Sequence, residues 1–309
     1  MMGAGHSHAP GPGVGAGHRR KLTLVLGITF TALVVEVVGA AVSGSLALLA
    51  DAGHALTDAA GLTLALVAAV LAQRPATPQR TWGYRRAEVL AAAAQAAVLL
   101  AVGVFVLVEG VRRLLDPPEV ASTAMLIFGV VGLVGNTVAI AVLASDRGTN
   151  LNMRAAFLEV VNDALGSAAV LVAAGCIALF GWQRADAVAS LLIGALILPR
   201  TWRLLRETVD VLLETTPKGL DLDDVRAHIL DLPHVRDVHD LHASQVATDL
   251  PVLSAHVVVD DDCFNDGHAP QILDQLQQCV ASHHGVSVEH STFQLEAAGH
   301  GEHEHPTHA

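Results

Sequence analysis

Long apolar runs separated by short polar stretches occupy about the first two thirds of the chain. A membrane-spanning helix needs about 20 predominantly apolar residues. The runs therefore predict six transmembrane helices, at residues 22–42, 46–71, 87–111, 123–143, 155–180 and 185–205. Alanine and glycine are frequent in these stretches, and small residues let transmembrane helices approach closely. We expect a compact helical bundle.

The pattern changes after Pro217, where acidic residues increase and the apolar runs become shorter. Helical and strand periodicities alternate there, and they predict a helix at 223–230, strands at 235–242 and 252–260, a helix at 269–282 and a strand at 287–295. These elements form a small α+β domain. The expected organisation is a disordered histidine-containing tail (1–21), a six-helix transmembrane domain (22–210), a cytoplasmic α+β domain (211–296) and a disordered His-rich tail (297–309).

Composition and charge agree with a membrane protein. Across 309 residues the hydrophobic fraction is 52% and the mean hydropathy is +0.49. Arginines gather in alternate loops, which predicts that both termini are cytoplasmic. The absence of a signal peptide and the Ala/Gly/Arg-rich composition suggest the plasma membrane of a bacterium. The formal net charge of -12 lies mostly in the soluble part and predicts no affinity for nucleic acid.

Two pairs of potential ligands occur in these apolar runs at the same spacing. His54 and Asp58 lie in the second predicted helix, and Glu159 and Asp163 lie in the fifth. Residues four apart share one face of a helix, so each pair can offer two ligand atoms to one cation. Placing an ionisable side chain inside the bilayer costs free energy, so such residues indicate ion or proton sites. The pattern therefore predicts a transporter for a divalent metal.

Other polar residues in the predicted helices occur singly. Glu36, Glu109 and Asn136 suit a structural role in helix packing as well as a role in transport. Asp51 lies one turn before His54, which favours a supporting or entrance position beside the metal. Asp186 begins the sixth predicted helix, where a helix-capping role is expected.

Several segments resemble the cation diffusion facilitators, the zinc-transporter and cation-efflux family. Residues 45–58, Ser-Leu-Ala-Leu-Leu-Ala-Asp-Ala-Gly-His-Ala-Leu-Thr-Asp, are similar to the signature of that family's second helix. Residues 162–167, Asn-Asp-Ala-Leu-Gly-Ser, resemble its fifth helix. Val-His-Asp-Leu-His at 238–242 and Ser-Ala-His-Val at 254–257 resemble its cytoplasmic domain. With the six predicted helices, the resemblance covers about residues 22–296.

The resemblance implies a homodimeric exporter that exchanges cytosolic Zn²⁺ for external protons at a tetrahedral site between the second and fifth helices. His54, Asp58 and Asp163 match the transport ligands by position. Glu159 departs from the pattern, because zinc-selective relatives usually have histidine there. One imidazole and three carboxylates form a harder site, so Mn²⁺, Fe²⁺, Co²⁺ and Cd²⁺ stay open as substrates. Zn²⁺ remains favoured because it accepts both donor types.

For the soluble part, the resemblance implies a metallochaperone-like domain that binds further metal at the dimer interface. The ligands expected there are His239, His256, His290 and Glu296. His242 and His268 are weaker candidates, and the remaining histidines of the domain, His228, His234, His283 and His284, are interpreted as surface residues. Cys176, Cys263 and Cys279 are far apart, which indicates neither a disulfide framework nor a thiolate zinc finger.

Two other classes of protein fit the sequence less well than a transporter. A membrane metalloenzyme lacks support, because the chain has no H-E-x-x-H pattern and no nucleophile with an evident base. We therefore expect a secondary active transporter, with no enzyme activity and no organic cofactor. A membrane-anchored metal buffer or sensor is favoured by the histidines of the tails, His6, His8, His18, His300, His303, His305 and His308, but leaves the intramembrane ligands unexplained.

Overall fold

The computed structural model describes residues 16–144, 151–282 and 285–300. His6, His8, His283, His284, His303, His305 and His308 lie outside the described residues. The first helix begins at Ala16, so residues 16–21 are helical and the prediction of a disordered tail is wrong for that segment. The predicted C-terminal tail begins with a turn, in which the backbone N–H of His300 donates to Ala297 O at 2.9 Å.

All six predicted membrane helices are present. They are α1 (Ala16–Ser43), α2 (Leu46–Ala72), α3 (Ala87–Leu115), α4 (Ser122–Ala144), α5 (Leu151–Phe180) and α6 (Arg184–Leu212). Five of them are long and apolar enough to cross a membrane, and the described part of α1 adds a shorter apolar stretch, Gly27–Ser43. Large apolar side chains such as Val108, Val172 and Leu196 lie exposed on the helices. This surface suits lipid rather than water.

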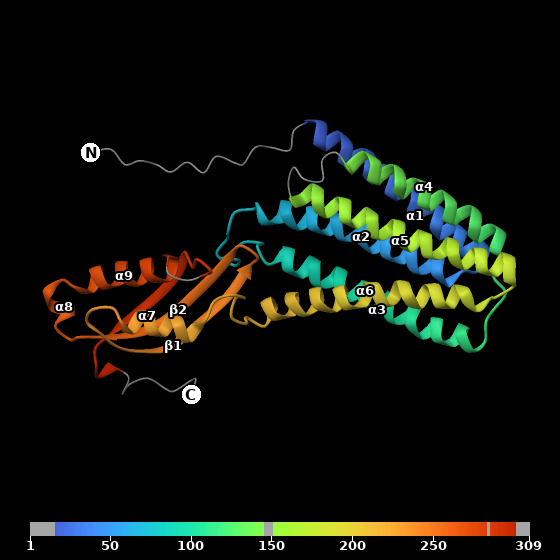
Figure 1. The fold of residues 1–309 in the computed structure, drawn as a ribbon. Helices are drawn as coiled ribbons and strands as arrows, with labels where there is room; N and C mark the ends of the chain where they lie inside the picture. The colour runs from blue at the N-terminus through green and yellow to red at the C-terminus, as the bar shows by residue number, and fades with distance from the viewer. Residues whose placement is uncertain (1–15, 145–150, 283–284, 301–309) are drawn as a thin grey trace. The chain divides into compact units, whose positions relative to one another are not determined.

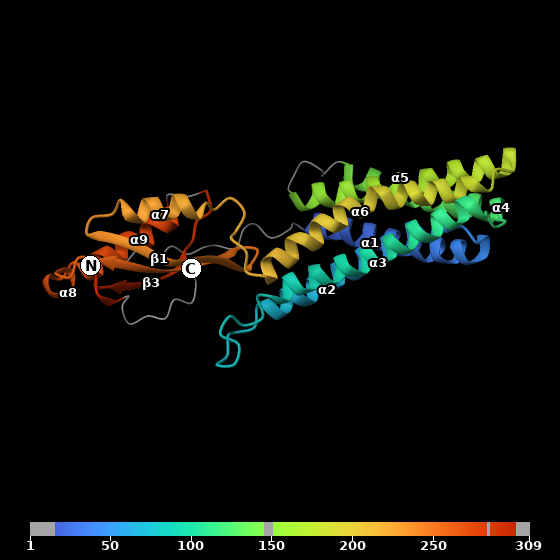
Figure 2. The same cartoon turned by 90° about the horizontal axis from the view of Figure 1, so that it is seen from below.

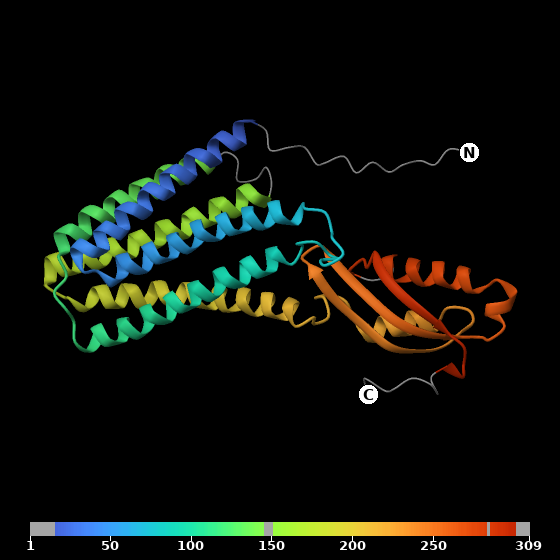
Figure 3. The ribbon, with the colours of Figure 1, turned by 180° about the vertical axis from the view of Figure 1, so that it is seen from behind.

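The described chain divides into two compact units, and the first comprises Met1–Leu62 and Gln95–Trp202. Within it, α1 packs along α4 and α4 packs along α5, as seen from both sides (Figure 1; Figure 3). Small residues set these distances: a Cβ on Gly39 of α1 would lie 2.5 Å from Phe128 Cβ of α4. A buried apolar cluster joins all six helices, with Leu48, Met125, Val170 and Ile193 among its members.

The second unit comprises Thr63–Ala94 and Arg203–Ala309, and contains the α+β domain. Its elements are α7 (Leu222–Leu230), β1 (Val235–Ala247), β2 (Leu250–Val259), α8 (Cys263–Asp266), α9 (Ala269–Ser282) and β3 (His290–Glu296). The sheet order is β1-β2-β3, with β1 antiparallel and β3 parallel to β2. β1 is longer than predicted, and the short α8 was not predicted.

Both long helices of the domain lie on one side of the sheet (Figure 2). Side chains alternate between the two faces of a strand. In β2, Leu253, Ala255, Val257 and Val259 are buried in the core under α7 and α9. His256 therefore belongs to the opposite, helix-free face of the sheet.

Candidate metal sites

The two predicted ligand pairs meet between α2 and α5. His54 Nε2 lies 3.4 Å from Asp58 Oδ2 on the same helix and 3.9 Å from Glu159 Oε1 on α5. Ligand atoms of His54, Asp58 and Asp163 all lie within 4.8 Å of one another. Buried His54 Nδ1 has no hydrogen-bond partner among the described residues. Unsatisfied donors and acceptors at a buried site are consistent with a place for an ion.

The close approach of α2 and α5 depends on a glycine. A Cβ added to Gly166 of α5 would lie 2.3 Å from Asp51 Oδ1 of α2. The hydroxyl of Ser167, the next residue, donates to Asp51 Oδ2 at 3.1 Å and accepts from Asn136 Nδ2 at 3.2 Å. Asp51 thus joins α2 to α5 near His54, and a supporting or entrance role beside the metal stays a prediction.

Glu159 has a partner that the sequence did not predict. Arg200 Nη2 of α6 donates to Glu159 Oε2 at 3.1 Å, while the other carboxylate oxygen faces His54. Arg200 is the residue after Pro199, which lies inside α6. The positions of the arginines in the sequence predicted only the orientation of the chain in the membrane. Its cation offsets the additional negative charge that Glu159 brings to a position where a neutral imidazole is expected.

The single polar residues of the helices fall into two groups. Glu36 and Asn136 are buried and line a small cavity together with Asp51 and Asp163, so polar groups continue from the ligand site toward α1 and α4. Glu109 instead forms ion pairs with Arg112 and Arg113 of its own helix, at 3.7 and 3.0 Å. This arrangement is structural.

Asp186 caps a helix, but not its own. Its carboxylate accepts hydrogen bonds from the backbone N–H groups of Leu46 and Ala47, at 2.8 and 3.1 Å, and from Ser45 Oγ at 2.5 Å. These donors form the N-terminus of α2, where a negative charge is favourable. The contact ties α6 to the helix that carries His54.

A second group of ligands lies on the helix-free face of the sheet. His239 of β1 pairs directly with His256 of β2. His239 Nε2 lies 3.0 Å from Glu296 Oε2, and His256 Nδ1 lies 2.7 Å from Glu296 Oε1. Glu296 is buried and also accepts from Gln294 Nε2 at 2.8 Å. Three of the four predicted soluble ligands are therefore together.

The prediction that His290 joins this group is wrong. Both His290 and Glu296 lie on β3, but six residues of a strand span about 20 Å. The ring of His290 instead packs edge-on against Trp82, in the loop between α2 and α3, with centroids 4.8 Å apart. His242 adjoins this group through Asp240: its Nε2 pairs with Asp240 Oδ1 at 2.9 Å, and Asp240 Oδ2 lies 3.8 Å from His256 Nε2.

Comparison with known families covers both parts of the chain. Residues 22–213 match the family described as the cation efflux transmembrane domain, and residues 217–298 match the cytoplasmic domain of cation efflux proteins. The chain belongs to the cation diffusion facilitator family. It is thus a multi-pass membrane protein of the divalent-metal efflux class.

Curated relatives are similar over nearly the whole chain. The metal cation efflux system protein CzcD of Cupriavidus metallidurans is 41% identical over 297 residues, covering 96% of this chain and 91% of the relative. The zinc transporter ZitB of Escherichia coli is 37% identical over 297 residues (96% and 93%). A Bacillus subtilis protein named cadmium, cobalt and zinc/H(+)-K(+) antiporter is 35% identical over 284 residues (91% and 90%).

Proposed function

We propose that this protein exports Zn²⁺, and secondarily Cd²⁺ or Co²⁺, in exchange for protons through the site formed by His54, Asp58, Glu159 and Asp163. The observation that carries the proposal is the convergence of one imidazole and carboxylates from two helices at one place among the membrane helices. Relatives named for zinc, cadmium and cobalt transport and for proton antiport support it.

Proton coupling follows from the chemistry of these side chains. The atoms that bind a cation, the imidazole nitrogen of His54 and the carboxylate oxygens, are also the atoms that bind protons. Metal and protons therefore compete for one site. If the site opens alternately to the two sides of the membrane, protons entering from outside displace the metal there, and metal from the cytosol displaces the protons.

The pairing of Glu159 with Arg200 bears on which metal is carried. Arg200 engages one oxygen of Glu159 and leaves the oxygen nearer His54 available. Because the cation also offsets the charge of Glu159, the site keeps an electrostatic balance close to that of two imidazoles with two carboxylates. This balance favours zinc-like ions over Mn²⁺, which prefers oxygen-rich sites.

The soluble domain is proposed to be cytoplasmic and to hold two copies of the chain together. The match to the cytoplasmic domain of cation efflux proteins supports this assignment. His239, His256 and Glu296 offer two nitrogens and an oxygen, a donor set that Zn²⁺ accepts. We assign metal binding to these three residues, with both termini in the cytoplasm and the bundle in the plasma membrane.

Metal flux into proteoliposomes tests the proposal. Purified protein is reconstituted with an acidic interior, and uptake of Zn²⁺, Cd²⁺, Co²⁺ and Mn²⁺ is compared with and without the pH gradient. We expect gradient-dependent uptake of the first three metals, and loss of that uptake in Asp163→Ala, because the substitution removes a ligand.

Asp116→Ala provides the matched control, since Asp116 lies exposed at the end of α3. It should transport as the wild type does. Equal flux in Asp163→Ala and in the control would show that the intramembrane carboxylates do not carry the metal.

A further inference from the structure

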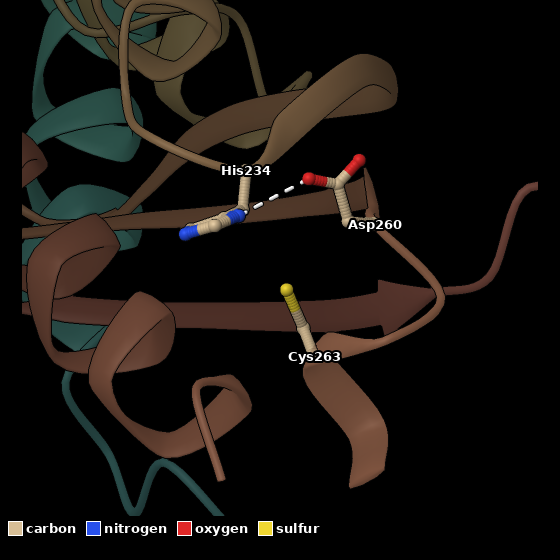
Figure 4. Close-up of side chains that lie close together, drawn as sticks. All are labelled: His234, Asp260 and Cys263. Carbon is tan, nitrogen blue, oxygen red and sulfur yellow. Dashed lines mark hydrogen bonds and ion pairs between the residues drawn. The ribbon is translucent and has the colours of Figure 1, made fainter. Parts of the chain in front are cut away.

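A group of histidine, aspartate and cysteine side chains lies at one end of the sheet of the soluble domain. His234 directly precedes β1, Asp260 directly follows β2, and Cys263 begins α8. One ligand atom from each lies within 4.8 Å of the others (Figure 4). The group shares no residue with His239, His256 and Glu296.

The fold itself brings these residues together. Val235 pairs with Val259 at the end of the antiparallel β1–β2 ladder, so the residue before β1 lies opposite the residue after β2. The backbone N–H of Asp260 donates to His234 O at 3.0 Å, and that of Cys263 donates to Asp260 O at 3.0 Å. His234 and Asp260 are far apart in the sequence, but the pairing of β1 with β2 brings them into contact.

The side chains converge on one point. His234 Nδ1 lies 3.1 Å from Asp260 Oδ2, and the Cys263 sulfur is directed toward both (Figure 4). The other oxygen of Asp260, Oδ1, accepts from Arg236 Nε. Cys263 is only 1% exposed, whereas His234 and Asp260 reach solvent. A nitrogen, an oxygen and a sulfur thus meet at a place that an ion can enter.

A second imidazole adjoins the group. The ring of His268 stacks on that of His234, with centroids 5.1 Å apart. His268 Nδ1 pairs with Asp266 Oδ2 at 2.7 Å, an orientation that directs the other ring nitrogen away from the carboxylate. Ligand atoms of Cys263, Asp266 and His268 also lie within 4.8 Å of one another. Cys263 is therefore shared by two neighbouring sets of donors.

Carboxylates of Asp260, Asp262 and Asp266 lie near the Cys263 thiol. Hydrogen bonds from His234 and Arg236 hold the pKa of Asp260 below its ordinary value, so its carboxylate stays ionised at neutral pH. Burial, and then the charges of Asp266, Asp260 and Asp262, raise the pKa of the Cys263 thiol. When a cation binds the sulfur, the thiol proton is released to solvent.

We propose that His234, Asp260 and Cys263 bind a thiophilic divalent cation, of the class of Zn²⁺, Cd²⁺ and Co²⁺. Thiolate and imidazole are the donors that such ions select. Binding joins the start of β1, the end of β2 and α8. This site is separate from the transport site, and its occupancy does not depend on whether the protein exchanges metal for protons.

Cobalt absorption of the full-length protein in detergent tests the proposal. Co²⁺ bound to a thiolate gives a sulfur-to-cobalt charge-transfer band, which the other two sites cannot give because they contain no sulfur. We expect the band in the wild type, its removal by added Zn²⁺ or Cd²⁺, and its absence in Cys263→Ser. Cys279→Ser, which changes a buried cysteine of α9, is the matched control and should keep the band.

His234→Asn keeps the test decisive if Cys263→Ser does not fold. His234 has a φ of 69°, in the left-handed region that asparagine tolerates, so this variant changes a ligand with little backbone strain. We expect its Co²⁺ affinity at this band to fall about tenfold or more. The proposal is overturned by a wild type without the band, by a band that persists in Cys263→Ser, or by unchanged affinity in His234→Asn.

Discussion

At the scale of single residues, the pairing of Glu159 with Arg200 distinguishes this membrane site from one made of two imidazoles and two carboxylates. The two residues lie on different helices, α5 and α6, and are joined by a hydrogen bond of 3.1 Å. Removing either partner leaves the other with an unbalanced charge next to the ligands. Such pairs are strongly non-additive when mutated.

A double-mutant cycle on Zn²⁺ binding tests this pair. In Glu159→His, Arg200 stays beside the ligands as an uncompensated cation, so we expect the dissociation constant to rise about tenfold or more. In Glu159→His/Arg200→Met we expect most of the affinity to return, because the repelling cation is gone. Calorimetric titration uses full-length protein that also carries His239→Ala and Cys263→Ser, which remove a ligand from each proposed metal site of the soluble domain. Additive effects of the two changes would contradict the account.

Helical spacing predicted which side chains of the membrane helices come together, but not their other partners. His54, Asp58, Glu159 and Asp163 were identified because helical spacing reveals a shared face without any knowledge of the fold. The Arg200 contact and the group around Cys263 depend on which elements pack together, which spacing does not encode. His290 was assigned to the soluble site because it lies on a predicted strand, but the register and length of β3 place it by Trp82.

At the scale of elements, the contact of α2 with α5 is the one on which the site depends. The run 162–167 that resembles the family contains Gly166, whose missing side chain makes room for Asp51. Ser167 and Asn136 then complete a hydrogen-bonded connection from α5 to α2 and α4. A shift of α5 would move Glu159 and Asp163 away from His54.

Gly166→Ala tests the role of this contact. The added Cβ would meet Asp51 Oδ1 at 2.3 Å, so α2 and α5 must separate or Asp51 must rotate. We expect a loss of stability of about 1–3 kcal/mol and a large loss of metal flux. Gly175→Ala on the same helix is the control, because its Cβ has no neighbour within 4 Å. Equal melting temperatures and fluxes in the two variants would show that the close approach is unimportant.

The elements were more predictable than their ends. Apolar runs of membrane length identify helices because a helix must have about 20 apolar residues to cross the bilayer. The start of α1 at Ala16 was missed, because the residues before the apolar run are polar and membrane thickness does not limit a helix outside the bilayer. The extension of β1 to Ala247 comes from pairing with β2, a tertiary contact that the local pattern does not show.

At the scale of the whole molecule, the account describes a transporter with a metal-binding soluble domain rather than a membrane-anchored metal buffer. A metal buffer does not need ligands between membrane helices, whereas a transporter does. Histidines in the tails could bind metal in a buffer. Deleting residues 1–15 and 301–309 separates these functions. We expect fewer loosely bound metal ions by equilibrium dialysis, but unchanged initial flux into proteoliposomes. A flux that falls in proportion to the lost binding would favour the buffer.

In the proposed mechanism, metal and protons use the same site in opposite directions. Simultaneous recording of Zn²⁺ entry and proton exit in one preparation of proteoliposomes, each with its own fluorescent indicator, tests it most directly. We expect both signals to begin together, to stop together when the pH gradient is collapsed, and to vanish together in Asp163→Ala. Zn²⁺ entry that continues without proton exit would contradict it.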